Sequence, residues 1–374
     1  MKILIAPNAF KGSLTAHRAA EIIAESLSPT FEPLLCPVAD GGDGTLDCLV
    51  TVTRGRLHNA FVTGPLPGMT VNARWGELGN KHAAVIEMAE AAGLRLLAER
   101  ERSAAKTTTF GVGELILNAL DSGFRTIYVG LGGSATNDGG AGCAQALGIR
   151  LLDRSGSVLP PGGIHLNGLQ TIDVSARDRR IADSEFICLS DVQAFLTGPS
   201  GTTSVYGSQK GATAAELRTL DDGLRHYAET MQRLLGVDVA SLEGAGAAGG
   251  LGAGLNAFCG ATIVSGIEYF LDLVNFNNLL RQSDVVVTAE GSIDEQTLQG
   301  KGIAGVARRA KELNKPVYAF AGRVKGDAEQ LCRRLGLRSI LQTAPSSMND
   351  AEAIGRADEL LSLKASEFAK SLAG

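Results

Sequence analysis

Two patterns of apolar residues alternate along the chain and predict its strands and helices. Short continuous apolar runs, typical of buried parallel strands, occupy residues 2–6, 34–38, 126–129, 185–190, 284–289 and 317–321. Apolar residues with helical spacing follow most of these runs, within residues 15–27, 45–51, 111–121, 213–235, 303–313 and 351–369. Alternation of strands and helices predicts an α/β protein.

The stretch from Arg56 to Met88 departs from this pattern. It contains three alternating runs, 57–63, 71–77 and 82–88, separated by Gly-Pro, Pro-Gly and Gly-Asn turns, which predict hairpin strands. Strand–helix alternation returns near residue 260. We therefore predict two α/β domains. One is a parallel-sheet domain built from residues 1–58 and 260–374, and the other, residues 59–259, is a mixed-sheet domain inserted into it.

Composition and charge narrow the range of functions. A length of 374 residues suits two domains, and a net charge of −5 with interspersed signs argues against a nucleic-acid partner or a membrane surface. The six cysteines form no C-x-x-C pair, and the five histidines lack metal-ligand spacing. No apolar run is long enough for a signal peptide or a membrane span. We expect a cytoplasmic protein that binds a small molecule.

The most informative loop is Gly130-Leu-Gly-Gly-Ser-Ala-Thr-Asn-Asp-Gly-Gly-Ala-Gly142, which lies between a predicted strand and a predicted helix. Its glycines allow the backbone to approach a ligand, and its N–H groups beside a helix N-terminus favour a phosphate. Ser134, Thr136 and Asn137 add donors, and Asp138 adds a charge suited to a metal ion or a ligand hydroxyl. A glycine-rich turn in a tightly packed α/β unit is the alternative.

Four other loops carry charged or polar residues after predicted strands, at the end where α/β proteins bind ligands. They contain Lys11 with Ser13, Asp40 with Asp43, Asp191, and Ser292 with Asp294 and Lys301. Phosphoryl transfer needs donors for phosphate, carboxylates for Mg²⁺ and an acid to orient the acceptor, and these loops contain each kind of group. The glycine-rich stretch 244–254 is either a flexible domain junction or a second wall of the site.

Known nucleotide fingerprints match poorly. Residues 130–135 and 244–249 fit the dinucleotide pattern G-x-G-x-x-G/A, but Thr136 to Gly140 intervene in the first before any helix-forming residue appears. No Walker A sequence is present. The residues alone leave three functions open: a small-molecule kinase, an NAD-type oxidoreductase acting on a small hydroxy acid, and a non-catalytic sugar-acid sensor.

Five separated motifs in order resemble the bacterial class I glycerate kinases. They are Ala6-Pro-Asn-Ala-Phe-Lys-Gly-Ser13, Ala39-Asp-Gly-Gly-Asp-Gly-Thr45, residues 130–140, Leu196-Thr-Gly-Pro199 with Gln209-Lys-Gly211, and Thr288-Ala-Glu-Gly-Ser-Ile-Asp294 with Gln296-Thr297. The resemblance implies ATP-dependent phosphorylation of D-glycerate, typically at the 2-hydroxyl, in glyoxylate or sugar-acid metabolism. It also implies a discontinuous flavodoxin-like domain that carries an inserted second α/β domain. Gln193 replaces an acid of the family pattern, whereas Asp191 is kept.

The resemblance and the loops together suggest a role for each candidate residue. We expect catalytic roles for Asp191, Asp294 and Lys11, with Asp191 ahead of Asp294 as the base. We expect Mg²⁺ ligands at Asp138 and Asp294, and a monomer or homodimer. The expected ATP contacts are Gly132, Gly133, Ser134, Thr136, Asn137, Ser292 and Lys301, and the expected D-glycerate contacts are Asn8, Ser13, Asp40 and Asp43.

Overall fold

The structure, a computed structural model, describes residues 1–295, 297–299 and 302–373 and divides the chain into two compact units. The first unit comprises Met1–Asp40 and Gly266–Gly374, and the second comprises Gly41–Ser265. The sequence places these boundaries near residues 58 and 260 instead. The difference at the first boundary has a physical cause, because helix α2 (Thr45–Thr53) packs on strands of the second unit.

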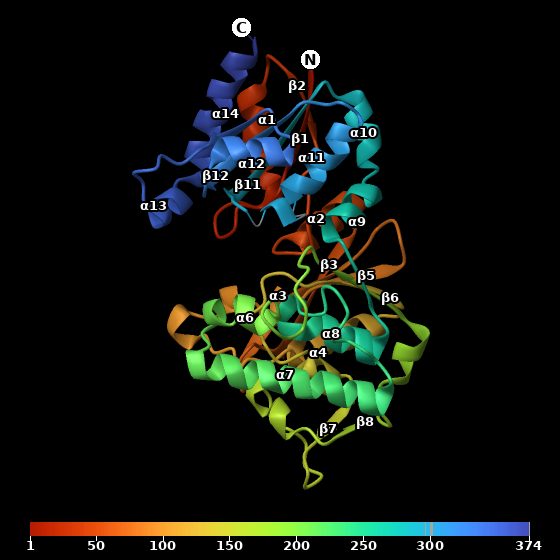
Figure 1. The fold of residues 1–374 in the computed structure, drawn as a ribbon. Coiled ribbons are helices and arrows are strands. Elements are labelled where there is room, and N and C mark those ends of the chain that lie inside the picture. The colour runs from red at the N-terminus through yellow and green to blue at the C-terminus, as the bar shows by residue number, and fades with distance from the viewer. Residues whose placement is uncertain (296, 300–301, 374) are drawn as a thin grey trace. The chain divides into compact units, whose positions relative to one another are not determined.

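A five-stranded parallel sheet forms the centre of the first unit (Figure 1). Its order is β13-β12-β11-β1-β2, the flavodoxin-like order in which the chain moves outward in both directions from β1 and β11. The strands are β1 (Lys2–Pro7), β2 (Glu32–Leu35), β11 (Val285–Ile293), β12 (Val317–Val324) and β13 (Ser339–Gln342).

Helices cover both faces of this sheet. Helices α1 (Ala16–Leu27) and α14 (Ala357–Ala373) pack side by side on one face, where they enclose a core with Ile3, Ile5 and Phe320 (Figure 1). Thr15 caps α1 as predicted, accepting a hydrogen bond from the Arg18 N–H at 3.1 Å. The remaining helices are α9 (Gly266–Leu273), α10 (Phe276–Gln282), η6 (Thr297–Gln299), α11 (Gly302–Glu312), α12 (Ala328–Leu335) and α13 (Asp350–Gly355).

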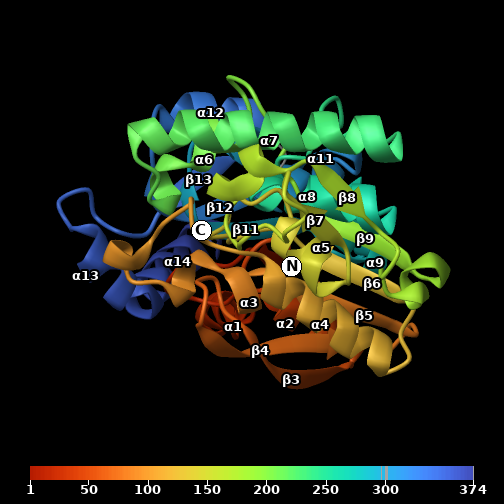
Figure 2. The same ribbon diagram turned by 90° about the horizontal axis from the view of Figure 1, so that it is seen from below.

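The second unit contains a six-stranded mixed sheet in the order β10-β9-β6-β5-β4-β3. Pairs β3–β4 and β4–β5 are antiparallel, which confirms the predicted hairpins, and the other pairs are parallel. Figure 2 shows β3 to β6 following one another across this sheet. The strands are β3 (Arg56–Thr63), β4 (Thr70–Glu77), β5 (Ala83–Glu87), β6 (Thr126–Gly130), β9 (Glu185–Leu189) and β10 (Thr262–Val264), and β7 (Arg150–Leu152) pairs separately with β8 (Thr171–Asp173).

The helices of the second unit enclose its core, with apolar residues such as Leu115, Leu224 and Leu251 packed against the sheet. They are α2, α3 (Ala89–Ala92), η1 (Leu94–Leu96), η2 (Glu99–Glu101), α4 (Phe110–Asp121), α5 (Ala141–Ala146), η3 (Gly163–Gly168), η4 (Arg179–Asp183), α6 (Thr202–Tyr206), η5 (Ser208–Lys210), α7 (Ala214–Leu235) and α8 (Ala247–Cys259). None of the described helices is long and apolar enough to cross a membrane. The predicted α/β class is confirmed in both units.

Candidate functional site

Three parallel strands of the second unit end at one edge of its sheet. The strand register aligns Glu87 of β5 with Gly130 of β6, and Gly130 with Leu189 of β9. The segments that follow these strands therefore start at the same edge, where α/β sheets bind ligands. One segment is the glycine-rich loop 130–142, and another contains Asp191.

The glycine-rich loop packs directly against the backbone that leads to α2. The N–H of Gly132 donates to the carbonyl of Gly41 at 2.9 Å, and the N–H of Leu131 donates to the carbonyl of Leu189 at 3.1 Å. A Cβ at Gly133 would lie 2.5 Å from Oδ1 of Asp43, and the φ of this residue is +73°. Glycine is therefore required here both for the backbone conformation and for the approach of Asp43.

Only the first part of the loop reaches solvent. Gly132 and Gly133 are partly exposed, whereas Thr136 and Asn137 are fully buried. The Thr136 hydroxyl donates to the carbonyl of Ala248 at 3.2 Å, and the Asn137 amide donates to the hydroxyl of Thr203 at 2.9 Å. These two hydrogen bonds connect the loop to α8 and α6, and the expected role of both side chains as nucleotide contacts stays a prediction.

The second glycine-rich stretch packs on the loop. Ala248, Gly249 and Gly250 have positive φ at the start of α8, and the Gly249 carbonyl accepts a hydrogen bond from the Gly139 N–H at 2.9 Å. A Cβ at Gly249 would collide with the Thr136 carbonyl. Residues 248–250 therefore pack on the glycine-rich loop, and whether the stretch 244–254 is also a second wall of the site stays a prediction.

Asp138, expected as a Mg²⁺ ligand, is buried and hydrogen-bonded within the loop and by Thr109. Its side chain is 1% exposed. The carboxylate accepts four hydrogen bonds, from the N–H and hydroxyl of Thr109 and from the N–H groups of Gly140 and Gly142. Burial raises the pKa of this carboxyl, and the four donors counteract the shift. A buried carboxylate with its oxygens occupied in this way does not fit a metal ion.

A charged cluster surrounds Asp43 at the same edge. Arg95 donates to Oδ1 of Asp43 and to Oε1 of Glu87, each at 3.2 Å, and also contacts Glu90. Oε2 of Glu87 accepts hydrogen bonds from the N–H groups of Gly44 and Leu46, at 3.0 and 3.1 Å. Glu87 is 2% exposed, and burial raises its pKa to about 7.

Sequence reasoning missed this cluster. Glu87 carries the signal that identified other candidates, an acid at the end of an apolar run, whereas Glu90 and Arg95 carry no comparable signal. Through its hydrogen bond, Arg95 holds the Asp43 carboxylate in a fixed orientation before any ligand binds.

Asp191 lies two residues beyond the end of β9, the strand next to β6. Its Oδ1 accepts a hydrogen bond from the hydroxyl of Ser265 at 2.7 Å, and the side chain is partly buried. Ser265 follows β10, so two neighbouring parallel strands supply the pair. Sequence reasoning identified Asp191 and missed Ser265.

Lys210 is a further residue that sequence reasoning did not single out, although it belongs to the motif Gln209-Lys-Gly211. Its ammonium nitrogen lies 2.7 Å from the Ser134 hydroxyl oxygen and 2.8 Å from the Thr136 carbonyl oxygen. The side chain is 3% exposed. Lys210 therefore brings a cation into contact with the glycine-rich loop.

In the first unit, predicted residues gather at the carboxyl ends of β1 and β11. The Asn8 amide donates to Oδ2 of Asp40 at 2.8 Å, and the Asn8 N–H donates to the carbonyl of Ala289 at 2.7 Å. Oε1 of Glu290 accepts from the Thr297 hydroxyl at 3.1 Å, and Oδ1 of Asp294 accepts from the Thr297 N–H at 3.3 Å. This is the position in the strand order where flavodoxin-like sheets bind ligands.

The other predicted residues of the first unit are less closely grouped. Lys11 and Ser13 are exposed in the turn after β1, where the Ser13 hydroxyl donates to the carbonyl of Phe10 at 3.2 Å. The Ser292 hydroxyl is buried and has no hydrogen-bond partner in the described part of the chain. Lys301 lies outside the described residues.

The described residues contain no cluster of three or more histidine, cysteine, aspartate or glutamate side chains that could hold a metal ion. Mg²⁺ in kinases needs only one or two carboxylates, because substrate phosphates and water complete its coordination. Glu290 and Asp294, which contact the same threonine, have the hard oxygen ligands that Mg²⁺ prefers. They fit this ion better than Asp138 does.

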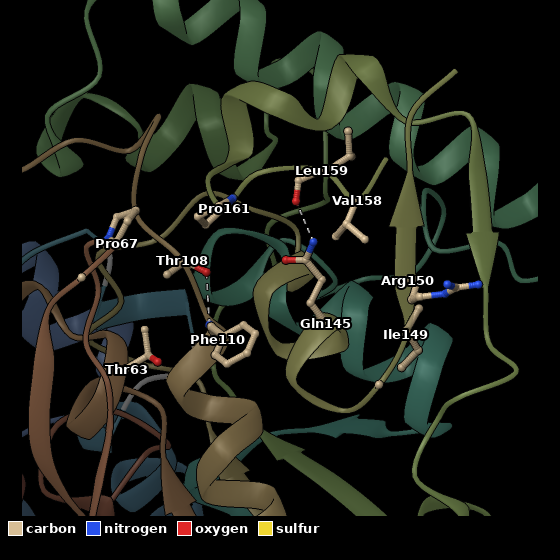
Figure 3. Close-up of a pocket in the computed structure, with 12 residues that line it drawn as sticks. Thr63, Pro67, Thr108, Phe110, Gln145, Ile149, Arg150, Val158, Leu159 and Pro161 are labelled. Carbon is tan, nitrogen blue, oxygen red and sulfur yellow. Dashed lines mark hydrogen bonds between the residues drawn. The ribbon is translucent and has the colours of Figure 1, made fainter. Parts of the chain in front are cut away.

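A pocket of about 530 Å³ lies elsewhere in the second unit (Figure 3). Apolar side chains such as Phe110, Ile149 and Leu159 form most of its lining, and Gln145 donates to the Leu159 carbonyl at 2.9 Å. None of the predicted site residues lines it. The candidate site is therefore defined by the sheet edges and not by this pocket.

Comparison with known proteins identifies the family. The model of the Glycerate kinase family matches residues 3–373. The chain belongs to the glycerate kinase family. A glycerate kinase of Bacillus subtilis strain 168 is 44% identical over 375 residues, covering 100% of this chain and 98% of the relative. A glycerate 2-kinase of Escherichia coli K12 is 46% identical over 330 residues, covering 87% of this chain and 86% of the relative.

The solved structures agree with this assignment. A crystal structure of a protein assigned as glycerate kinase 2 from Salmonella typhimurium LT2 has a TM-score of 0.83 and 43% identity, and the match covers 100% of this chain and 98% of that one. The resemblance found in the sequence is confirmed. The protein is an enzyme that phosphorylates glycerate, a phosphotransferase with an alcohol group as acceptor, and the oxidoreductase and sensor alternatives are set aside.

Proposed function

We propose that this enzyme transfers the γ-phosphoryl group of ATP to the 2-hydroxyl of D-glycerate, giving 2-phosphoglycerate. The observation that carries the choice of hydroxyl is the 46% identity with a relative described as a glycerate 2-kinase. The donor is proposed as ATP because the family consists of kinases, and because the loop 130–142 is rich in glycine and its backbone is partly exposed at Gly132 and Gly133, which suits a phosphate.

The proposed roles in the second unit follow from the sheet edge. Gly132, Gly133 and Ser134 bind phosphate through backbone and hydroxyl donors, because this part of the loop adjoins solvent. Asp191 orients the acceptor hydroxyl and takes its proton, and Ser265 holds the carboxylate for that task. Asp43, fixed by Arg95, is proposed to accept a hydrogen bond from a glycerate hydroxyl.

The first unit contributes the remaining groups of the proposal. Asn8, Asp40 and Ser13 are retained as glycerate contacts, and Lys11 as a cation for the transferred group. Ser292 is retained as a nucleotide contact because its buried hydroxyl lacks a partner in the described chain. Mg²⁺, held by Glu290 and Asp294, would neutralise charge on the phosphates. A cytoplasmic enzyme, monomeric or homodimeric, completes the proposal, and six free thiols are consistent with a reducing compartment.

The test is a steady-state assay of ADP release from ATP, with Mg²⁺ and D-glycerate, on the wild type and two matched variants. Asp191→Asn keeps the side-chain shape and removes the charge, so kcat should fall by about 10²–10⁴-fold with little change in ATP affinity. Asp294→Asn should mainly raise the Mg²⁺ concentration required. A fall in ATP affinity with kcat preserved in Asp191→Asn would move the role of base to Asp294. Absence of glycerate-dependent ADP release would refute the proposed function.

A further inference from the structure

Lys210 is a buried cation without a carboxylate partner among the described residues. Both acceptors of its ammonium group are neutral: the hydroxyl of Ser134 and the carbonyl of Thr136. The nearby Asp138 attracts it electrostatically, yet the oxygens of that carboxylate are engaged by Thr109, Gly140 and Gly142. The positive charge is therefore only partly compensated inside the protein.

Such a charge is unfavourable in a protein interior. Transfer of an ammonium group out of water is costly unless an opposite charge or a full set of hydrogen bonds replaces the water. Burial accordingly lowers the pKa of Lys210 to about 7. An ammonium has three N–H donors, and only two of those of Lys210 have acceptors in the described chain. A bound anion close to this group would remove the imbalance.

The contact with Ser134 fixes the direction of a second donor. A hydroxyl has one proton to donate, and because Oγ of Ser134 accepts from Lys210, that proton must be directed away from the lysine. Within the described residues the Ser134 proton has no acceptor, although the side chain is only 8% exposed. The N–H of Gly133 likewise lacks an acceptor there. Gly133 is partly exposed, and the buried Ser134 is the next residue along the loop.

We infer that Lys210 is a positioning residue for phosphate binding: its ammonium group holds Ser134 so that the hydroxyl proton and the Gly133 N–H point to one phosphate oxygen, and it supplies the positive charge behind them. This inference rests on the proposed use of ATP. Lys210 acts through Ser134 and does not touch the reacting atoms. The carbonyl of Thr136, bound to the same ammonium, keeps the loop in this orientation.

The test compares ATP affinity in the wild type, Lys210→Met, Ser134→Ala and the double variant. The dissociation constant of ATP is measured by calorimetry without glycerate, and the KM for ATP is then measured in the kinase assay. The methionine side chain is unbranched like that of lysine and only one atom shorter. Replacing a buried charge with an apolar side chain of similar volume is often neutral or stabilising, so the variant should fold. Loss of a hydrogen bond to a charged group should weaken ATP binding by about 10- to 100-fold. The loss should appear more strongly in the KM for ATP than in kcat at saturating ATP.

The double-variant cycle separates positioning from a structural effect. If Lys210 acts through Ser134, the double variant should bind ATP no more weakly than Lys210→Met alone. The inference would be overturned if the losses of ATP affinity in the two single variants multiplied in the double variant. It would also be overturned if Lys210→Met bound ATP within about twofold of the wild type. A wild type that binds ATP without phosphorylating glycerate would refute the proposed function and leave the binding test of Lys210 valid. A wild type that does not bind ATP would overturn both.

Discussion

Replacing Asp138 by asparagine separates a structural role from a metal-binding one. The ionised carboxylate accepts three hydrogen bonds at Oδ2, from the Thr109 N–H, the Thr109 hydroxyl and the Gly142 N–H, and one at Oδ1 from the Gly140 N–H. Asparagine can keep its oxygen at the first position only. Its NH₂ group then faces the Gly140 N–H, so a buried donor loses its acceptor.

The magnitude follows from these contacts. A buried donor left without an acceptor costs about 1–3 kcal/mol. The three remaining bonds change from charge-assisted to neutral, each weaker by about 1 kcal/mol, while the neutral amide avoids the cost of burying a charge. We expect Asp138→Asn to lower the free energy of unfolding by about 3 kcal/mol. The enzyme should stay folded, because domains are typically stable by about 5–15 kcal/mol.

The assay is urea unfolding followed by circular dichroism, together with an Mg²⁺ titration of the kinase activity. Asp153→Asn is a matched control, because Oδ1 of Asp153 also accepts hydrogen bonds from Ser155 and Ser157 but in an exposed turn. Its effect on the free energy of unfolding should stay below about 1 kcal/mol. Unchanged stability of Asp138→Asn, with a higher Mg²⁺ requirement, would refute the structural role and restore the metal assignment.

Three further predictions concern Glu87 in the charged cluster, the close approach of Gly133 to Asp43, and Mg²⁺. The pKa of Glu87 is raised to about 7 from an ordinary value near 4.5, so its contribution to folding is fully present below about pH 4.5 and is lost as pH rises through 7. Between pH 4.5 and 8 the free energy of unfolding of the wild type should therefore fall by about 3 kcal/mol relative to that of Glu87→Gln. A difference in urea unfolding that does not change with pH would contradict this. Gly133→Ala should displace Asp43 and lower kcat/KM for glycerate at least tenfold. Gly68→Ala is the control, because Gly68 also has a positive φ but open space around its Cβ position, and it should leave activity unchanged. Equal activities of the two variants would show that the Asp43 contact is unimportant. Chelation of Mg²⁺ by excess EDTA should abolish ADP release, and full activity under that condition would exclude a metal requirement.

Much of the fold could be predicted because the relevant signals are local. Apolar runs located the buried strands, and the Thr15 cap located the start of α1. The closing helix was predicted as one segment, 351–369, but it is interrupted after Gly355, where α13 ends and α14 begins at Ala357. The boundary near residue 58 differed from the structure because the packing of α2 on β4 and β5 is a long-range property.

The candidate site was predicted less completely because its decisive contacts join distant residues. Lys210 meets Ser134 from 76 positions away, and Ser265 meets Asp191 from 74 positions away. No local pattern indicates either pair. The burial of Asp138 could not be predicted for a similar reason: a polar loop predicts exposure, whereas donors at Thr109, 29 residues earlier, hold this carboxylate in the interior.

The position of the phosphate on the product distinguishes phosphorylation of the 2-hydroxyl from phosphorylation of the 3-hydroxyl. The enzyme would be incubated with ATP, Mg²⁺ and D-glycerate, and the product followed by proton-coupled ³¹P NMR, in which a phosphate on the C2 oxygen is split by one proton and a phosphate on the C3 oxygen by two. We expect a doublet that grows with ADP formation, and no such signal from the Asp191→Asn variant on the same time scale. A triplet would contradict phosphorylation at the 2-hydroxyl.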